Sequence, residues 1–523
     1  MIDRSRRAFM RDGLAATGAL SLGAGLLSAC GQDAAAPAPA GTEKPRRGGS
    51  VKLAVIGGNQ TGNLDAHKPV GSGAFRGWAL YSKLWEWNRN ANPGLALAEF
   101  AEVNEDATAW TIRLHKGLEF HHGKSITADD VIFSLRRLTD PQLASPYGMA
   151  YLYSLQRDGI TKLDPLTVRI PFAKGHGLAA LPELWMSWGG IVPTDYDPIR
   201  NVIGAGPYRL KSFTPGQRSV FTRFENYYKA EQPYLDEVEI IDFNDPITRL
   251  QAMQTGQVNV APNLAYEQLA FFKSSPDFQV VSSQTDAWHG FAMNIAAPPF
   301  NDPRVRQAFR LLADREELVK RVLHGHGRVA NDLYSPSDPT YNHDIPQRRR
   351  DVAEARRLLK AAGHGGGLAL ELVTTAGVGA NAALVFAQQA REAGIAIKVQ
   401  LVDNAIFTGP ARNSFTFSTS TGVSRPFLLT LQQHDGPRSA ANKTHFSDPR
   451  FAELVTAAQA QPDVVKRKAL IGAAQQIQHD SGGLLIWGFA DNQEAVSRRI
   501  GGVAPDRTGF AAWRTDALWQ RQA

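Results

Sequence analysis

The sequence predicts a mixed protein of helices and sheets (α/β, mixed α+β) with more than one lobe, and three observations support this prediction. Segments with strand-like alternation and segments with helical spacing of apolar residues follow each other along the chain without an internal repeat. The chain has 523 residues, 43% of them hydrophobic, which suffices for two or three domain cores. Its single cysteine, Cys30, lies in the N-terminal leader, so buried apolar side chains rather than disulfides must stabilise the body.

Residues 1–29 have the layout of an export signal, with a basic start followed by an uncharged run rich in Gly and Ala. The segment SRRAFM, which contains Arg6 and Arg7, resembles a twin-arginine signal. The segment LSAC resembles a lipobox, which predicts cleavage before Cys30 and attachment of lipid to its thiol. The alternative is a cleaved signal followed by an incidental cysteine.

The next segment, residues 30–47, is dominated by Ala, Pro and Gly and shows no apolar period. Such a composition is typical of a flexible tether between a membrane and a folded body. Regular structure is expected from about Gly49, because residues 50–56 alternate as a strand does.

A strand followed by a helix is predicted between residues 109 and 138. The segment AWTIRL places alternate apolar side chains on one face of a strand. Thr127 then stands where a helix N-cap is expected, and acidic residues occupy the first turn near the positive end of the helix. The stripe expected to be buried consists of Val131, Leu135 and Leu138.

Further helices and a strand are predicted after residue 300. Asp302 is the expected N-cap of one helix, and Asp314 with Glu317 forms a potential capping box that starts the next. Another helix is expected to end at Gly363, and residues 395–402 have the pattern of a strand.

Motifs of common enzymes are missing from the sequence. It contains no GxSxG, Walker loop, GxGxxG or HExxH pattern, and no thiol outside the leader. The 57 Lys and Arg residues, which contribute to a formal net charge of +7, are dispersed rather than grouped as in nucleic-acid-binding proteins. We therefore expect no enzymatic activity, no cofactor, no metal centre and no nucleic-acid partner, with a hydrolase as the weakest alternative.

Several segments, in chain order, carry a resemblance to a known family. They are RRGGSVKLAV, NLDAHK, WTIRLHKGLEFHHGKSITADDVIFSLRRL, IGAGPYRL, ENYYKAEQPYLDEVEI, RLQAMQTGQVNV and MNIAAPPFNDPRVRQAFRLLADREELV. Together they resemble the extracytoplasmic solute-binding proteins of peptide-type ABC transporters, the family 5 or oligopeptide/dipeptide-binding group. The resemblance runs from about residue 48 to the C-terminus.

The resemblance implies a two-lobed clamshell, the periplasmic-binding-protein fold with an extra subdomain in lobe I. The implied boundaries are 48–288 for lobe I with the extra subdomain at about 85–200, 289–488 for lobe II, 489–523 for the return to lobe I, and crossing strands at 287–294 and 484–494 as the hinge.

The function that the resemblance implies is capture of a peptide-like or other small organic solute, including anionic ones, between the lobes. A membrane permease of an ABC importer then reads the closed form. We expect a monomer in the periplasm or at the cell surface, held at the membrane by lipid on Cys30.

Two loops in lobe II bear on the ligand. The segment STSTGVSRPF has Arg425 where dipeptide-binding relatives tend to have an acid for the peptide amine. The segment VTTAGVGAN carries no charge where relatives often have a base for the peptide carboxylate. These differences argue against an ordinary dipeptide as the ligand. The candidate ligands that remain are longer peptides, opines, sugar conjugates or another anionic solute.

Arg425 is expected to contact a negative group of the ligand, and the alternative is a local ion pair with Asp435. The ligand-contacting residues that we expect are Ser72, Trp288, His289, Thr375, Thr421, Ser424, Arg425 and Trp487. A metal-chelate receptor of the nickel-binding type would instead use His289 and His434, and a surface chaperone or adhesin-like lipoprotein is a further alternative.

Overall fold

The computed structural model of the chain describes residues 43–57, 63–69, 72–145, 147–148, 154–173, 176–182 and 189–522. Residues 1–44 and residues 45–523 are two separate units, and the second contains the helices and strands given below. Arg6, Arg7 and Cys30 lie outside the described residues, as does most of the segment predicted to be a tether.

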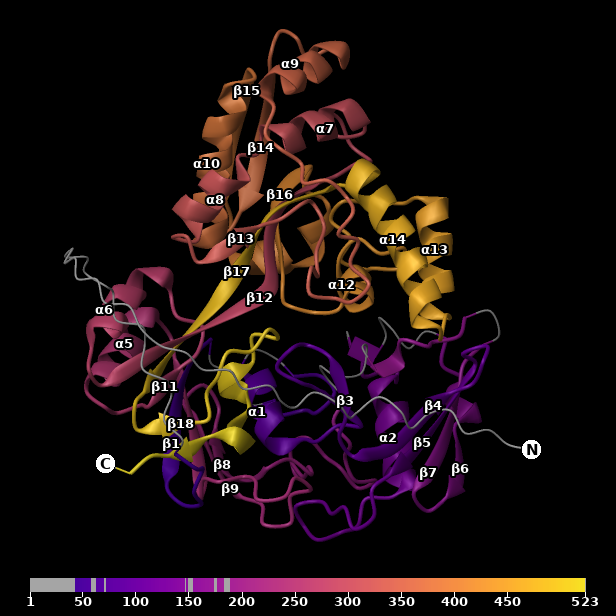
Figure 1. The fold of residues 1–523 in the computed structure, drawn as a ribbon, viewed down its shortest axis with the longest axis vertical. Helices are drawn as coiled ribbons and strands as arrows, with labels where there is room; N and C mark the ends of the chain where they lie inside the picture. Colours follow the sequence, from indigo (N-terminus) through magenta and orange to yellow (C-terminus); the bar gives the residue numbers. More distant parts are fainter. Residues whose placement is uncertain are drawn as a thin grey trace, which may run out of the picture. The chain divides into compact units, whose positions relative to one another are not determined.

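One large mixed sheet is the main feature of residues 45–523 (Figure 1). Its strands follow the order β15-β14-β16-β12-β17-β11-β1-β10-β9-β8, and β13 pairs with β17 beside that path. Their bounds are β15 (Ile395–Leu401), β14 (Leu368–Thr374), β16 (Phe417–Gly422), β12 (Phe278–Met293), β17 (Leu484–Ser497), β11 (Val260–Ala261), β1 (Ser50–Ile56), β10 (Glu237–Phe243), β9 (Arg218–Arg223), β8 (Tyr208–Thr214) and β13 (Gly327–Val329). Strands far apart in sequence thus lie next to one another.

The two longest described strands, β12 and β17, run antiparallel along most of their lengths. They link one end of the sheet, which contains β1, β9 and β8, to the other, which contains β14 and β15 (Figure 1). Their register shifts twice, between Gln284 and Ala287 and between His289 and Gly290. At Gly290 the strands approach so closely that an added Cβ would lie 2.5 Å from the Leu485 carbonyl oxygen. Glycine is therefore required at this crossing.

Smaller sheets lie elsewhere in the described part of the chain. Four antiparallel strands follow the order β4-β5-β7-β6, and two strand pairs are β2–β3 and β18–β19. Their bounds are β4 (Ala98–Val103), β5 (Ala109–Leu114), β6 (Thr161–Asp164), β7 (Thr167–Pro171), β2 (Trp85–Trp87), β3 (Pro93–Leu95), β18 (Ile500–Gly501) and β19 (Trp519–Gln520). The four-stranded sheet lies within the segment for which the sequence predicts an extra subdomain.

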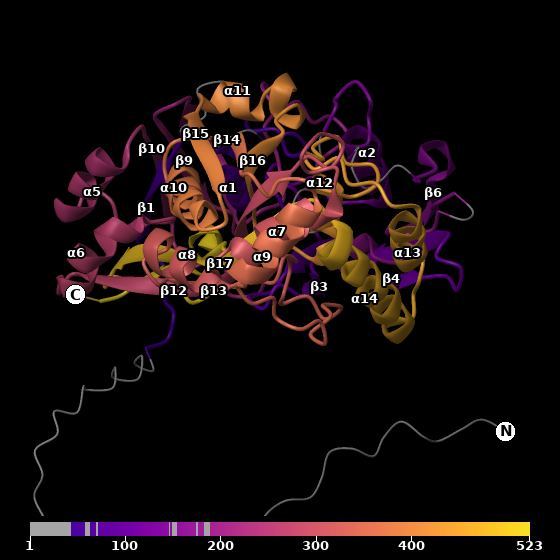
Figure 2. The ribbon, with the colours of Figure 1, turned by 90° about the horizontal axis from the view of Figure 1, so that it is seen from above.

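The helices pack around these sheets. Their bounds are α1 (Gly73–Leu80), α2 (Ala128–Leu138), α5 (Pro246–Gln254), α6 (Leu269–Ser274), α7 (Pro303–Leu312), α8 (Arg315–Val322), α9 (Val352–Ala361), α10 (Val378–Arg391), α11 (Asn404–Thr408), α12 (Phe427–Gln433), α13 (Pro449–Gln459) and α14 (Val464–Ser481). In both views α13 and α14 lie side by side, on the opposite side from α5 and α6 (Figures 1 and 2). A single apolar cluster joins α7, α8, α9 and α10 to Phe291 of β12 and Trp487 of β17.

Most of the predicted local signals are confirmed. Strand β1 covers the predicted residues 50–56, Thr127 caps α2, and the predicted stripe of α2 is fully buried. The capping box at Asp314 is only half formed. The Asp314 side chain accepts from the backbone N–H of Glu317, but the backbone N–H of Asp314 donates to Gln389 of α10. Glu317 instead contacts Gln389 of α10 and Arg321 one turn further along α8.

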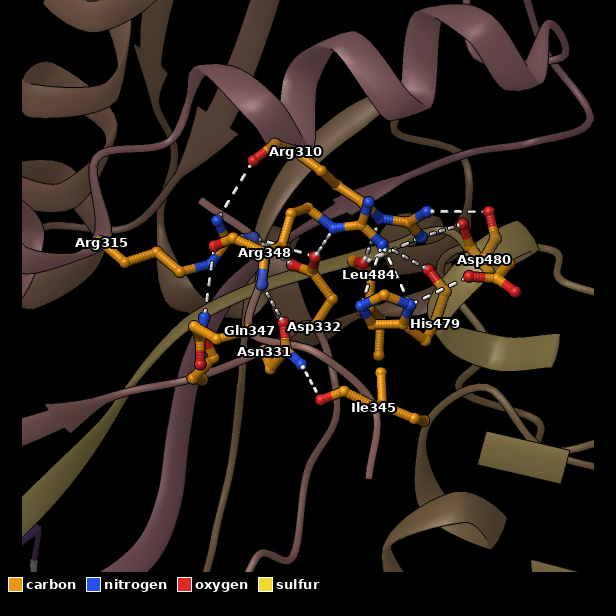
Figure 3. Close-up of polar contacts among 12 residues, drawn as sticks. Arg310, Arg315, Asn331, Asp332, Ile345, Gln347, Arg348, His479, Asp480 and Leu484 are labelled. Carbon is orange, nitrogen blue, oxygen red and sulfur yellow. Dashed lines mark hydrogen bonds and ion pairs between the residues drawn. The ribbon is translucent and has the colours of Figure 1, made fainter. Parts of the chain in front are cut away.

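A buried cluster of charged residues holds the start of β17 in place (Figure 3). Arg315 contacts both carboxylate oxygens of Asp332 at 2.7 and 2.9 Å, and Arg348 contacts one of them at 2.8 Å. Burial raises the pKa of Asp332, but the three arginines around it outweigh burial and lower the pKa below its usual value. Arg310 donates to the backbone carbonyls of Gly482 and Leu484, which follow α14. The cluster therefore ties α7, α8 and α14 to the first residue of β17.

Within the described ranges no helix is both long enough and apolar enough to span a bilayer.

Candidate binding site

A cavity of about 570 Å³ lies over the paired strands β12 and β17 at their register shifts. Strand residues Thr285, Ala287 and His289 line it from β12, and Ala490 lines it from β17. The remaining lining comes from residues 491–493 of β17, from Val322 at the end of α8, from residues 377–381 at the start of α10, and from segments at 263–267, 423–425 and 508–513. The volume is in the range of ordinary small-molecule sites.

A second cavity of about 300 Å³ shares His289 and Val378 with the first. Its polar lining consists of hydroxyl-bearing residues, two bases, two histidines, one amide and one acid, namely Thr375, Thr408, Thr419, Ser420, Thr421, Thr444, Arg412, Lys443, His289, His434, Gln433 and Asp435. Strand β16 supplies three of these hydroxyls, and the segment after α12 supplies Lys443. We refer to the two as the larger and the smaller cavity.

Arg425 lines the larger cavity and also a cavity of about 100 Å³ beside it. Its guanidinium donates to the side chain of Gln433, and its backbone carbonyl accepts a 2.6 Å hydrogen bond from Ser335. Asp435, the alternative ion-pair partner that the sequence suggests for Arg425, accepts hydrogen bonds from Tyr334 and Gln478.

Ser424 is buried and lies in the same two cavities as Arg425. Its hydroxyl donates to the backbone carbonyl of Arg507 at 2.6 Å and accepts from the backbone N–H of Asp286 at 3.2 Å. Ser424 thereby fixes the loop that carries Arg425 against the C-terminal segment and against β12.

Two histidines lie at the cavities, and both are held neutral. Burial lowers the pKa of His289 to about 4, and its ring stacks on Trp487 at 5.6 Å between centroids. Burial, with the charges of Arg425 and Lys443, lowers the pKa of His434 to about 3. Both line the smaller cavity. Two histidines on one cavity could suggest a metal site. In the described part of the chain, however, no three His, Cys, Asp or Glu residues are grouped so as to hold a metal ion.

Three of the residues predicted to contact ligand lie elsewhere. Trp288 and Trp487 are 1% and 0% exposed and line neither cavity, so they support the wall from behind. Ser72 is buried beside the ion pair between Arg76 and Asp242, accepting from the first and donating to the second. The structure thus brings together His289, Thr375, Thr421, Ser424 and Arg425, but not these three.

Comparison with known proteins identifies the family. The model of the bacterial extracellular solute-binding proteins, family 5 (middle region), matches residues 91–425, which is more than half of the chain. The chain belongs to this family.

The curated relatives of this family 5 solute-binding protein are named for different solutes. Di/tripeptide-binding protein 2 of Pseudomonas aeruginosa is 27% identical over 421 residues, 74% of this chain and 79% of the relative. Heme-binding protein A of Haemophilus influenzae is 28% identical over 316 residues, 55% of this chain and 57% of the relative, so the match spans little more than half of that protein. These relatives are binding proteins, which confirms the prediction that the chain is not an enzyme.

Solved structures confirm the two-lobed periplasmic-binding-protein fold. AgaA of Agrobacterium tumefaciens, in complex with agropinic acid, superposes with a TM-score of 0.77 at 22% identity and covers 91% of this chain and 99% of AgaA. DppA of Helicobacter pylori, an ABC transporter-associated periplasmic binding protein in complex with the peptide STSA, also gives a TM-score of 0.77, at 20% identity over 91% of this chain and 99% of DppA.

Some residues at the cavities of this family 5 solute-binding protein were not predicted from sequence. Asp491 lines the larger cavity, and burial raises its pKa although Arg328, 3.4 Å away, acts in the opposite direction. Arg412 and Lys443 line the smaller cavity. Asp491 could have been proposed because it lies in the predicted hinge strand. Arg412 lies in the short 3₁₀ helix Pro410–Asn413 and Lys443 lies in a turn, and neither segment is long enough for a periodicity that would indicate the direction of a side chain.

Proposed function

We propose that this protein is the substrate-binding lipoprotein of an ABC importer, which captures a peptide-like or other small organic solute, including anionic ones, and delivers it to a membrane permease. The observation that carries this proposal is the larger cavity, which lies on the long strands β12 and β17. The names of the relatives, which include binders of peptides and of heme, support a small solute of this kind.

In this proposal the lobes are residues 48–288 with 489–523, and residues 289–488. The register shifts in the β12–β17 pair form the hinge, because hydrogen bonding between the strands is interrupted there. A solute that contacts both walls of the larger cavity stabilises the closed arrangement, and the permease reads that arrangement.

The larger cavity offers complementary charges to such a solute. Asp491 and Glu267 line it as acids, and Arg425 lines it as a base. An amino group of the solute would contact Asp491, and a carboxylate or another negative group would contact Arg425. The partial desolvation of these groups makes each charge-assisted contact stronger than it would be in water.

Export and anchoring complete the proposal. Arg6 and Arg7 direct the precursor to the twin-arginine route, and lipid on Cys30 holds the mature protein at the membrane. Tethering raises the concentration of the receptor near its permease.

A native mass spectrum of the protein, extracted from membranes in mild detergent, tests the proposal. We expect a chain that begins at Cys30 and carries diacylglycerol, with a small organic molecule bound that is lost on denaturation. The matched control, Cys30→Ser, should lose the lipid and retain the small molecule. An N-terminus without lipid would contradict the anchor. An empty protein that no peptide or organic acid stabilises against heat would contradict solute capture.

A further inference from the structure

We propose that the smaller cavity is an anion subsite, in which Lys443 and Arg412 bind a carboxylate or phosphate group of the captured solute. This inference rests on the proposed function and specifies the class of solute. The proposed subsite lies in the smaller cavity, whereas Arg425 lines the larger one, and its two bases are different residues.

Lys443 lines the smaller cavity, and no described acid forms an ion pair with its ammonium group. It makes no hydrogen bond or ion pair with any residue that the structure describes, and it lies over the ring of Phe407 at 3.8 Å from the centroid. Burial, together with the charge of Arg412, lowers the pKa of Lys443 to about 8. An anion in the cavity would remove the repulsion between the two bases and restore the charge of Lys443.

Arg412 cannot escape the same repulsion by losing its proton, because a guanidinium stays charged in proteins. Its side chain donates to the backbone carbonyl of Ala440 at 3.1 Å, a neutral acceptor. A guanidinium with donors left over beside an ammonium matches the planar oxygens of a carboxylate or phosphate.

The acid at the smaller cavity does not neutralise these bases. One carboxylate oxygen of Asp435 accepts from Tyr334 at 2.9 Å, and the other accepts from Gln478 at 2.8 Å. Burial raises the pKa of Asp435, although these two hydrogen bonds act in the opposite direction. His289 and His434 also line the cavity, but both are neutral near pH 7. Two bases line the cavity with one acid, so the cavity carries positive charge near pH 7 whether or not Asp435 is ionised.

Free hydroxyl groups complete the polar lining. The hydroxyls of Thr375, Ser420 and Thr421 make no hydrogen bond to another described residue, although all three residues line the smaller cavity. They are available to donate to the oxygens of a bound group. Since His289 and Val378 line both cavities, one solute can place its anionic end here and its remainder in the larger cavity.

Trace acetylation of lysines by acetic anhydride, read by peptide mass spectrometry, tests the subsite directly. The probes are glutarate, glycerol 3-phosphate and the neutral isostere glutaramide, each added to the mature protein. At probe concentrations several times the dissociation constant, either anion should slow acetylation of Lys443 by about threefold or more. Glutaramide should leave the rate unchanged. The exposed Lys116 is the internal control and should show no effect.

Arg412→Gln is the matched variant. It removes the second base, while the acetylation rate of Lys443 still reports whether an anion is bound. Protection by either anion should fall to less than half of that in the wild type. Protection by glutarate alone would assign a carboxylate subsite, and protection by glycerol 3-phosphate alone a phosphate subsite. Equal rates with and without both anions, or equal slowing at Lys116, would overturn the inference.

The outcome is separable from that of the proposed function. A protein that carries a bound solute in the native spectrum but shows no anion protection at Lys443 refutes the subsite alone. A protein that shows protection but binds no solute refutes the proposed function and leaves a local anion site.

Discussion

Arg425 combines a permanent charge with a position on the larger cavity. Its guanidinium keeps its proton at any physiological pH, so closure of the cavity around it is favourable only if polar partners replace its water. Gln433 supplies a neutral partner, and the buried Ser424 fixes the loop from the preceding position. This arrangement suits a base that is held in place before the solute arrives.

We predict that Arg425→Ala weakens binding of the co-purified solute by about 2 kcal/mol, or about thirtyfold, which is typical of the loss of a charge-assisted partner. The melting temperature without solute should change little, because the hydrogen bond from Ser335 goes to the backbone of Arg425. Isothermal titration calorimetry measures the affinity for the solute, and differential scanning calorimetry measures the melting temperature. Arg450→Ala, on an exposed arginine of α13, is the control. An unchanged affinity would show that Arg425 does not contact the solute.

Single residues differ in how far sequence alone could place them. His289, Ser424 and Arg425 were predicted to contact ligand, and all three line the larger cavity. Ser72 was predicted on the same basis of family resemblance, yet it serves a buried ion pair. Whether a serine faces a cavity or an ion pair depends on tertiary neighbours, and a single sequence does not contain that information.

At the scale of elements, the sequence predicts strands and helices well where local interactions determine their bounds. The bounds of β1 and the cap of α2 follow from alternation and from a Thr before an acidic turn. The half-formed box at Asp314 shows the opposite case, because Gln389 of α10 competes for the same groups. The register shifts of β12 against β17 also escaped prediction, since they arise from pairing between strands about 200 residues apart.

Glu494 of β17 predicts a pH dependence of stability. Burial raises its pKa from the ordinary 4.5 to about 8, and one carboxylate oxygen makes no hydrogen bond to another described residue. Between pH 4.5 and 8 the folded protein therefore holds a proton that the unfolded chain has released. This linkage lowers the free energy of unfolding as pH rises, by at most about 1.4 kcal/mol per pH unit.

Glu494→Gln should remove this contribution, so the stability of the variant relative to the wild type should increase from pH 4.5 to pH 8. Urea unfolding at several pH values measures the free energy of unfolding of both proteins. In the difference between variant and wild type, the contributions of other titrating groups cancel. Glu105→Gln, at an exposed position, should show no such trend. A difference that stays constant with pH would mean that Glu494 is ionised in the folded protein.

At the scale of the molecule, the segments quoted from the sequence sufficed to predict the family and the two-lobed fold, and both are confirmed. The cavities could not be predicted in the same way. Their walls combine segments such as 263–267, 377–381 and 423–425, which only the folded chain brings together. The lobe boundaries stay a prediction, as does the lipid on Cys30, which lies outside the described residues.

We predict that the two lobes move relative to one another about β12 and β17. The register shifts lie at the floor of the larger cavity, so a rotation there would change the distance between its walls without breaking the flanking strand pairs. A solute that contacts both walls favours the closed arrangement by its difference in affinity for the two states. The radius of gyration from small-angle X-ray scattering should therefore be smaller for protein that retains its co-purified solute than for protein from which the solute has been removed. Arg425→Ala at the same solute concentration should lie between the two, because fewer molecules are occupied. Identical scattering profiles with the cavity filled and empty would rule out lobe closure and would leave capture in a preformed cavity.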